Sequence, residues 1–314
     1  MMKKAVLPKP LRGIIPPIIT PLLDSNTLDV KSLEKLLEHI LSGGVHGVFI
    51  LGTTGELSSL SYRLRHEFVE HTCELVAGRV PVLVGITDTA LAESIQLAQT
   101  AEKCGAAAVV AAAPYYFSLS QAELIRYYQQ LADQSPLPLF LYNMPSHTKI
   151  SLEPKSVKIL TQHPNIIGIK DSSGNGVNFQ LLQYQLKDNP DFSLLVGPEE
   201  LTAEVVLLGA HGGINGGANM FPKLYVDLYE AALARDLDRL LPLHQRVMQI
   251  STNLYTVGSS QASYLQGVKC ALSLMGICQN VLAEPLQPLP EKEQTIVRQY
   301  LQELNVMLPT NAAV

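Results

Sequence analysis

The chain has 314 residues, of which 47% are hydrophobic and 16% charged, and its formal net charge is −5 at pH 7. The charged share lies well below the ~25% of average soluble domains, which predicts a large apolar core. The sequence contains neither a run of ~18 apolar residues that could span a membrane nor a basic block that could follow a nucleic-acid backbone. We therefore expect neither a membrane nor a nucleic acid as a partner.

The cysteines and histidines show no metal-binding spacing. Four cysteines and eight histidines form neither a Cys-x-x-Cys pair nor a zinc-type histidine pair, so we predict no metal site and no disulfide framework. Pro8 and Pro10 interrupt the short apolar run at the start of the chain, which leaves no signal-peptide pattern. We expect a cytoplasmic protein that uses no cofactor.

Short β-branched runs alternate with amphipathic segments between residues 13 and 217, a pattern typical of repeated strand–helix units. The predicted strands begin at Gly13, Gly47, Val80, Ala106, Leu137, Ile166, Phe192 and Gly212. Their mean spacing of about 28 residues is close to the ~30 that a strand and its crossover helix require. This predicts an α/β fold with a closed (β/α)8 TIM barrel. A doubly wound open sheet is the alternative, because alternation alone does not decide closure.

The helical segments have readable ends. Asp29, Ser61 and Ser120 stand where helix N-caps are expected, and Gly105 where a helix should stop. After residue 217 the strand pattern ends, and the sequence predicts helices over 221–235, 236–256, 263–276 and 291–304. We therefore predict a catalytic barrel domain over 1–235 and an all-helical extension over 236–314.

Lys170 stands out at the carboxyl end of a predicted strand, where a barrel places its reactive groups. It follows the apolar run 166–169. Burial disfavours a charged ammonium, and a neutral amine can attack a ketone to form a Schiff base, which opens aldol chemistry without a metal. The alternative is an ion pair with Asp171 or with a carboxylate of a neighbouring strand.

Tyr142 ends the preceding predicted strand, so a barrel would place it beside Lys170, where its hydroxyl can carry a proton. The alternative is a core tyrosine whose hydroxyl reaches the surface. Thr53 and Thr54 lie in a Gly-Thr-Thr-Gly turn before a helix, and their amides and hydroxyls can hold a carboxylate. An ordinary polar turn is the alternative for the two threonines.

Two further features lie at predicted strand ends. Glu56 is predicted to cap or orient its loop rather than to transfer protons. The glycine-rich segment 212–217 lacks the G-x-G-x-x-G spacing of a dinucleotide-binding loop. We interpret it either as a close backbone approach to a ligand or as tight closure of the barrel.

Four short motifs occur together in the sequence. They are Gly-Thr-Thr-Gly-Glu at 52–56, Pro-Tyr-Tyr at 114–116, Tyr-Asn-Met-Pro at 142–145 and Gly-Ile-Lys-Asp at 168–171. In their order and spacing the chain resembles the dihydrodipicolinate synthase and N-acetylneuraminate lyase superfamily of class I, pyruvate-handling aldolases. The similarity extends over nearly the entire chain.

The resemblance assigns roles to these residues. It implies that Lys170 forms an imine with C2 of a 2-oxo acid and that Tyr142 shuttles the proton. It also implies that Thr53 and Thr54 hold the carboxylate, with Thr54 hydrogen-bonded to Tyr142. Gly197 and Ile214 match positions that line the pocket through backbone groups.

The resemblance also concerns assembly. Tyr116 is similar to the tyrosine that family members contribute across a dimer interface to the proton relay of the neighbouring subunit. Members of the superfamily are usually homotetramers built as dimers of dimers, and we expect the same here.

One departure from the family pattern bears on the substrate. His147 stands where dihydrodipicolinate synthases usually have an arginine for the carboxylate of aspartate semialdehyde, and Lys149 stands where they have glycine. A neutral imidazole offers one donor, whereas a guanidinium offers a bidentate fork. Lys149 either compensates for the missing charge or is an ordinary surface lysine.

We therefore predict a lyase that joins pyruvate to an aldehyde or releases it, acting on a 2-keto-3-deoxy sugar acid or a related hydroxy-oxo acid. The alternatives are dihydrodipicolinate synthase itself and a dehydratase that uses the same imine. A non-catalytic small-molecule sensor is a further alternative, against which the intact set of Lys170, Tyr142 and Thr54 argues.

Overall fold

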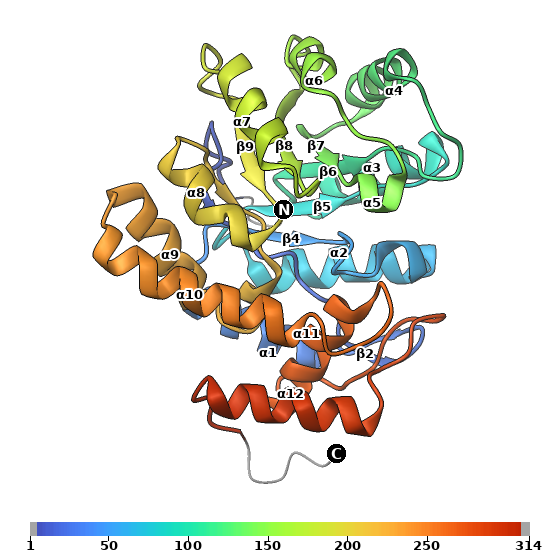
Figure 1. Cartoon of the computed structure of the whole chain (residues 1–314). Helices are drawn as coiled ribbons and strands as arrows, with labels where there is room; N and C mark the ends of the chain where they lie inside the picture. Colours follow the sequence, from blue (N-terminus) through green and yellow to red (C-terminus); the bar gives the residue numbers. More distant parts are fainter. Residues whose placement is uncertain (1–4, 309–314) are drawn as a thin grey trace.

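The structure of the chain is a computed structural model that describes residues 5–308. Eight parallel strands form one sheet in the order β1-β10-β9-β8-β7-β6-β5-β4 (Figure 1). The strands are β1 (Gly13–Ile14), β4 (Val48–Ile50), β5 (Val82–Gly85), β6 (Ala108–Ala112), β7 (Leu139–Asn143), β8 (Ile166–Asp171), β9 (Ser193–Val196) and β10 (Gly212–Gly213).

The segment that continues β1 closes the sheet into a barrel. Pro17 forms a parallel bridge with Phe49, and the Ile18 amide donates to the Phe49 carbonyl at 2.8 Å. On the other side β1 pairs with β10. The predicted (β/α)8 barrel is therefore confirmed, and the open sheet is excluded.

Helices follow the strands around the barrel. They are α1 (Val30–Ser42), α2 (Tyr62–Val76), α3 (Leu91–Lys103), α4 (Gln121–Gln134), α6 (Pro154–Leu160), α7 (Gly176–Gln185), α8 (Thr202–Leu207) and α9 (Pro222–Ala234). A short hairpin of β2 (Leu22–Asp24) and β3 (Thr27–Leu28) precedes α1, and the single-turn helix α5 (Pro145–Thr148) follows β7.

The predicted helix caps have the expected hydrogen bonds. Asp29 accepts the Ser32 amide at the start of α1, and Ser61 accepts the Leu64 amide at the start of α2. Ser120 begins α4 with a full capping box. Each cap satisfies amides that have no partner within the helix, which is why these residue types are readable signals.

The barrel interior has its own apolar core, separate from the core beneath the surrounding helices. It includes Leu11, Ile15, Phe49, Leu83, Ala108, Val110, Ala112, Phe140, Tyr142, Leu195 and Ile214. Alternate residues of barrel strands point inward, so these side chains fill the barrel as packed layers. Tyr142, one of the predicted site residues, belongs to this interior set.

Three helices follow the barrel, α10 (Leu237–Leu254), α11 (Ser263–Leu274) and α12 (Glu291–Glu303). They lie on the side of the molecule that also carries α1 and the β2–β3 hairpin (Figure 1). Their apolar faces share one hydrophobic core with the barrel helices. The boundary between 235 and 236 stays a prediction, and residues 309–314 of the predicted extension lie outside the described residues.

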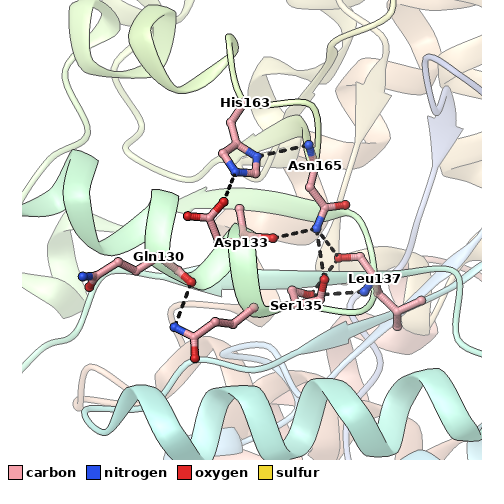
Figure 2. Close-up of polar contacts among 8 residues, drawn as sticks. Gln130, Asp133, Ser135, Leu137, His163 and Asn165 are labelled. Carbon is pink, nitrogen blue, oxygen red and sulfur yellow. Dashed lines mark hydrogen bonds and ion pairs between the residues drawn. The ribbon is translucent and has the colours of Figure 1, made fainter.

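A polar cluster ties the loops together at the amino ends of β7 and β8 (Figure 2). The Asn165 side chain donates to the carbonyls of Ala132, Ser135 and Leu137 at 2.9–3.2 Å. The Asn165 amide donates to His163, which lies 3.0 Å from Asp133. These bonds fix the start of both strands at the end of the barrel opposite to the predicted site.

Among residues 5–308 no helix is long and apolar enough to cross a membrane.

Candidate active site

Lys170 lies in the mouth of the barrel on β8, with 4% of its surface exposed. Its amine lies 4.2 Å from the ring centre of Tyr142 and 5.0 Å from that of Phe49. Within residues 5–308 it forms neither a hydrogen bond nor an ion pair with another side chain. The amine therefore lies beside two aromatic rings, and no carboxylate among the described residues pairs with it.

Asp171 does not pair with this lysine. Successive residues of a strand point to opposite faces, and the Asp171 carboxylate accepts hydrogen bonds from Asn143 Nδ2 at 2.7 Å and from Ser173 N and Oγ at 3.0 and 2.6 Å. These bonds satisfy the carboxylate outside the barrel interior. The alternative interpretation of Lys170 as half of an Asp171 ion pair is thus excluded.

Tyr142 is the register partner of Lys170 on the neighbouring strand β7. Its hydroxyl lies 3.2 Å from Thr53 Oγ1. The hydrogen bond that the resemblance assigned to Thr54 is therefore formed by Thr53 instead. Thr54 Oγ1 lies 3.0 Å from the hydroxyl of Tyr264. In a tight turn adjacent side chains leave the backbone in different directions, so only one of two neighbouring threonines reaches Tyr142.

The turn that carries these threonines is unusually compact. Leu51 and Glu56 both have left-handed backbone conformations, with φ of 56° and 58°. An ideal Cβ at Gly55 would lie 2.9 Å from the Leu51 nitrogen and 3.2 Å from the Ile18 carbonyl oxygen. Glycine is required there because any side chain would collide with backbone. The Thr20 hydroxyl also donates to the Gly55 carbonyl at 2.7 Å, which fixes the turn against the barrel.

Gly197 and Ile214 lie at the carboxyl ends of β9 and β10. The Gly197 amide donates to the Asp171 carbonyl at 2.7 Å, and the Ile214 amide donates to the Val196 carbonyl at 2.8 Å. Both amides are thus used within the barrel, and the Gly197 carbonyl also accepts from Asn215 Nδ2 at 3.2 Å. Their role in the pocket stays a prediction.

Tyr116 does not join the site of its own chain. It is 80% exposed, and its ring packs edge-on against Phe117 with the ring centres 5.2 Å apart. Tyr115 and Phe117 are exposed beside it. The expected role of Tyr116 in a neighbouring subunit stays a prediction, and an exposed aromatic loop is the feature that such a role requires.

His147 lies in α5, directly after the strand that carries Tyr142. Its Nδ1 lies 2.9 Å from Ser146 Oγ. The His147 side chain is exposed, but desolvation of its imidazole lowers its pKa, and the positive charges of Lys149 and Lys170 lower it further. The imidazole is therefore neutral at pH 7 and lies close enough to Lys170 to sense its charge. Lys149 is exposed and donates to the Ser146 carbonyl at 2.7 Å.

Glu199 lies at the same end of the barrel as Lys170, although the sequence did not assign it to the site. Glu199, just after β9, is buried and accepts hydrogen bonds from the Gly217 amide at 2.9 Å, from Tyr255 at 2.8 Å and from Tyr225. Burial raises the pKa of Glu199 from 4.5 to about 7, although these hydrogen bonds oppose the change. A carboxyl that titrates near neutrality therefore lies at this end of the barrel.

The glycine-rich segment 212–217 indicated a close approach of other atoms to the backbone, and the structure shows what those atoms are. An ideal Cβ at Gly216 would lie 1.7 Å from the Tyr264 hydroxyl, and one at Gly217 would lie 1.9 Å from the Tyr225 hydroxyl. The close approach in this segment is therefore to tyrosine side chains. At Gly212 the same construction meets the Gly13 carbonyl at 1.9 Å, so tight barrel closure, the second interpretation, is confirmed there.

Comparison with known proteins fits this geometry. The sequence model of the dihydrodipicolinate synthetase family matches residues 10–304. The chain belongs to this family. Its membership of the dihydrodipicolinate synthetase family confirms the resemblance drawn from the four motifs.

Three relatives illustrate the range of the family. The solved dihydrodipicolinate synthase of Bacteroides thetaiotaomicron is 55% identical, with a TM-score of 0.92, over 94% of this chain and 99% of that one. The 4-hydroxy-tetrahydrodipicolinate synthase of Methanopyrus kandleri is 32% identical over 95% of this chain and 97% of its own length. Escherichia coli YagE, provisionally named a 2-dehydro-3-deoxy-D-gluconate aldolase, is 34% identical over 94% of this chain and 97% of its own.

Proposed function

We propose that the chain is a Schiff-base-forming class I aldolase that acts on pyruvate and an aldehyde. The observation that carries the proposal is the Lys170 amine, enclosed by two aromatic rings beside Tyr142 and without a carboxylate partner among the described residues. A lysine amine enclosed in this way can attack the carbonyl carbon of a bound 2-oxo acid. The structure of YagE in complex with pyruvate supports the choice of 2-oxo acid.

In the cleavage direction the Lys170 nitrogen attacks the C2 ketone, and water leaves to give an imine. The departing water takes its proton from Tyr142, and the resulting phenolate then accepts the proton of the C4 hydroxyl while the C3–C4 bond breaks and the aldehyde departs. The bonding electrons flow into the imine and form an enamine. Tyr142 passes this proton to C3, and hydrolysis of the imine then releases pyruvate and restores the amine and the Tyr142 phenol. Thr53 holds the Tyr142 hydroxyl in place throughout.

A 2-keto-3-deoxy sugar acid is the substrate class that we favour. His147 replaces the arginine that dihydrodipicolinate synthases usually present to a second carboxylate, and a neutral imidazole suits hydroxyl groups better than a carboxylate. The provisional name of YagE agrees with this choice.

The second candidate is synthesis of dihydrodipicolinate from pyruvate and aspartate semialdehyde. The names of the Bacteroides and Methanopyrus relatives favour it, the first at 55% identity. In this case Lys149 would have to supply the charge that His147 lacks. We also propose that the exposed aromatic loop 115–117 packs against a second subunit within a homotetramer.

Reductive trapping tests the shared chemistry. Borohydride added with pyruvate should attach a stable three-carbon adduct to Lys170, located by peptide mass spectrometry, and should abolish activity. Lys170→Ala should show no adduct and lose about 10³-fold or more in kcat. Lys187→Ala is the matched control, because Lys187 also lies over a tyrosine ring but is exposed on the surface. An unmodified Lys170 in the wild type would refute the proposal.

A substrate comparison separates the two candidates. We expect kcat/KM for 2-keto-3-deoxygluconate, measured from the pyruvate released, to exceed that for aspartate semialdehyde. A value of about 10⁴ M⁻¹s⁻¹ or more with aspartate semialdehyde, and a lower one with the sugar acid, would assign the synthase reaction instead.

A further inference from the structure

Helix α11 of the C-terminal extension reaches the turn that carries Thr53 and Thr54. It makes contact at two points. The Tyr264 hydroxyl lies 3.0 Å from Thr54 Oγ1, and Lys269 forms an ion pair with Glu56. More than 200 residues of sequence separate the partners in each contact. The barrel turn is therefore shaped by a segment outside the eight strand–helix units.

The Tyr264 side chain occupies a site built for its hydroxyl. An ideal Cβ at Gly216 would overlap this oxygen, so a residue with a side chain there would displace it. The ring packs edge-on against Tyr255 with the ring centres 4.7 Å apart. Burial raises the pKa of Tyr264, so the phenol stays protonated across the physiological range.

This hydrogen bond joins two hydroxyls, either of which can donate. A buried phenol proton needs an acceptor, and within residues 5–308 the partner of the Tyr264 hydroxyl is Thr54 Oγ1. Thr54 is buried as well, and the arrangement that suits a ligand is the one in which Tyr264 donates and Thr54 accepts. The Thr54 hydroxyl has a single proton, and this arrangement leaves that proton free for an external acceptor.

The ion pair holds the other end of the turn. Glu56 and Lys269 are both buried. Glu56 also accepts the Ala283 amide at 2.7 Å, and Lys269 donates to the Val281 carbonyl at 2.6 Å. Each partner thus has a second anchor in the loop after α11. As expected from the sequence, Glu56 orients its loop, and its anchor lies in the extension.

We propose that Tyr264 is a positioning residue that aims the Thr54 hydroxyl at the carboxylate of the bound 2-oxo acid. The inference rests on the proposed function, because the carboxylate is the acceptor that the free Thr54 proton requires. It makes the helical extension part of the substrate-binding machinery. Tyr264 itself touches no reacting atom in this scheme.

The test is Tyr264→Phe, which keeps the ring and removes only the hydroxyl. We measure the pyruvate concentration that gives half-maximal borohydride trapping at Lys170, and KM and kcat for the overall reaction. The half-saturating concentration and KM should rise about tenfold, the size expected for a misaligned hydrogen bond to a charged group. The kcat should change less than about threefold, because the chemical step is untouched.

Two controls separate positioning from general damage. Tyr128→Phe also removes a buried hydroxyl, which donates to the Ala111 carbonyl away from the turn, and it should leave pyruvate half-saturation unchanged. Acetone lacks the carboxylate, so Tyr264→Phe should not alter the rate at which acetone and borohydride label Lys170.

The possible outcomes are distinct. Unchanged half-saturation in Tyr264→Phe, with normal trapping in the wild type, would overturn the inference and leave the aldolase proposal standing. An equal loss of labelling with acetone and pyruvate would also overturn it, because the defect would not involve the carboxylate. No adduct in the wild type with either ketone would refute the proposed function and the inference together.

Discussion

The two ends of the barrel hold polar residues in opposite states. At the amino end Asn165 donates to three carbonyls, and its neighbours His163 and Asp133 are paired with each other (Figure 2). At the carboxyl end the Lys170 amine has no partner among the described residues, and in the proposed arrangement the Thr54 proton awaits an acceptor. The polar cluster at the first end is saturated, whereas the second end leaves the Lys170 amine unpaired among its satisfied neighbours.

This difference distinguishes polar groups that stabilise the fold from polar groups that are available to a ligand. A buried polar group left without a partner costs free energy, and a fold keeps such groups where a ligand can supply the missing contact. Changes at the amino end should therefore alter stability and leave catalysis intact. Changes at the carboxyl end should alter catalysis and, where they remove an unfavourable burial, raise stability.

Glu199 gives the largest expected effect on stability. Its pKa is raised to about 7 in the folded chain, against the ordinary 4.5, so the folded state binds the proton more tightly than the unfolded one. Stability from this group is therefore fully present below pH 4.5 and is lost as the pH rises towards 7. The raised pKa corresponds to about 3 kcal/mol.

Glu199→Gln removes this titration. The free energy of unfolding of the variant, relative to wild type, should rise by about 3 kcal/mol between pH 4.5 and 7.5, as measured by urea denaturation at fixed protein concentration. A difference that does not depend on pH would show that the Glu199 carboxyl is not desolvated. The pKa of this carboxyl would then not set the carboxyl end of the barrel apart from the amino end.

Tyr142 tests the comparison of the two barrel ends through its effect on kcat. Tyr142→Phe should lower kcat by about 10²-fold, the usual contribution of a positioned acid–base group, with little change in stability. Thr53→Val should lower kcat less, and adding it to Tyr142→Phe should cost nothing further, because both variants remove the same hydrogen bond. Additive losses in the double variant would separate the two residues.

The sequence predicted most of the barrel and part of the site. Strand order, the caps at Asp29, Ser61 and Ser120, and the neighbouring placement of Lys170 and Tyr142 all follow from local patterns and from the regular geometry of a barrel. Side-chain periodicity and capping chemistry act within a few residues, so a single sequence displays them directly.

The contacts that the C-terminal extension makes with the Thr53–Thr54 turn could not be predicted from local patterns. The contacts of Tyr264 with Thr54 and of Lys269 with Glu56 join segments more than 200 residues apart, and no local pattern marks Tyr264 or Lys269 as the partner. The choice of Thr53 rather than Thr54 as the partner of Tyr142 depends on the twist of one turn. The glycines at 216 and 217 signalled crowding but not what causes it.

Asn165 supplies the smallest expected effect and the most direct test of the amino end. Asn165→Ala removes the donor shared by the carbonyls of Ala132, Ser135 and Leu137 and should lower the free energy of unfolding by about 1–3 kcal/mol. Asn165→Asp should cost more than alanine, because a carboxylate only accepts hydrogen bonds and would face those carbonyls with negative charge. Both variants should retain wild-type kcat and KM, since the cluster lies at the opposite end from Lys170. A fall in kcat without loss of stability would show that the two ends are coupled and that saturation does not mark a purely structural role.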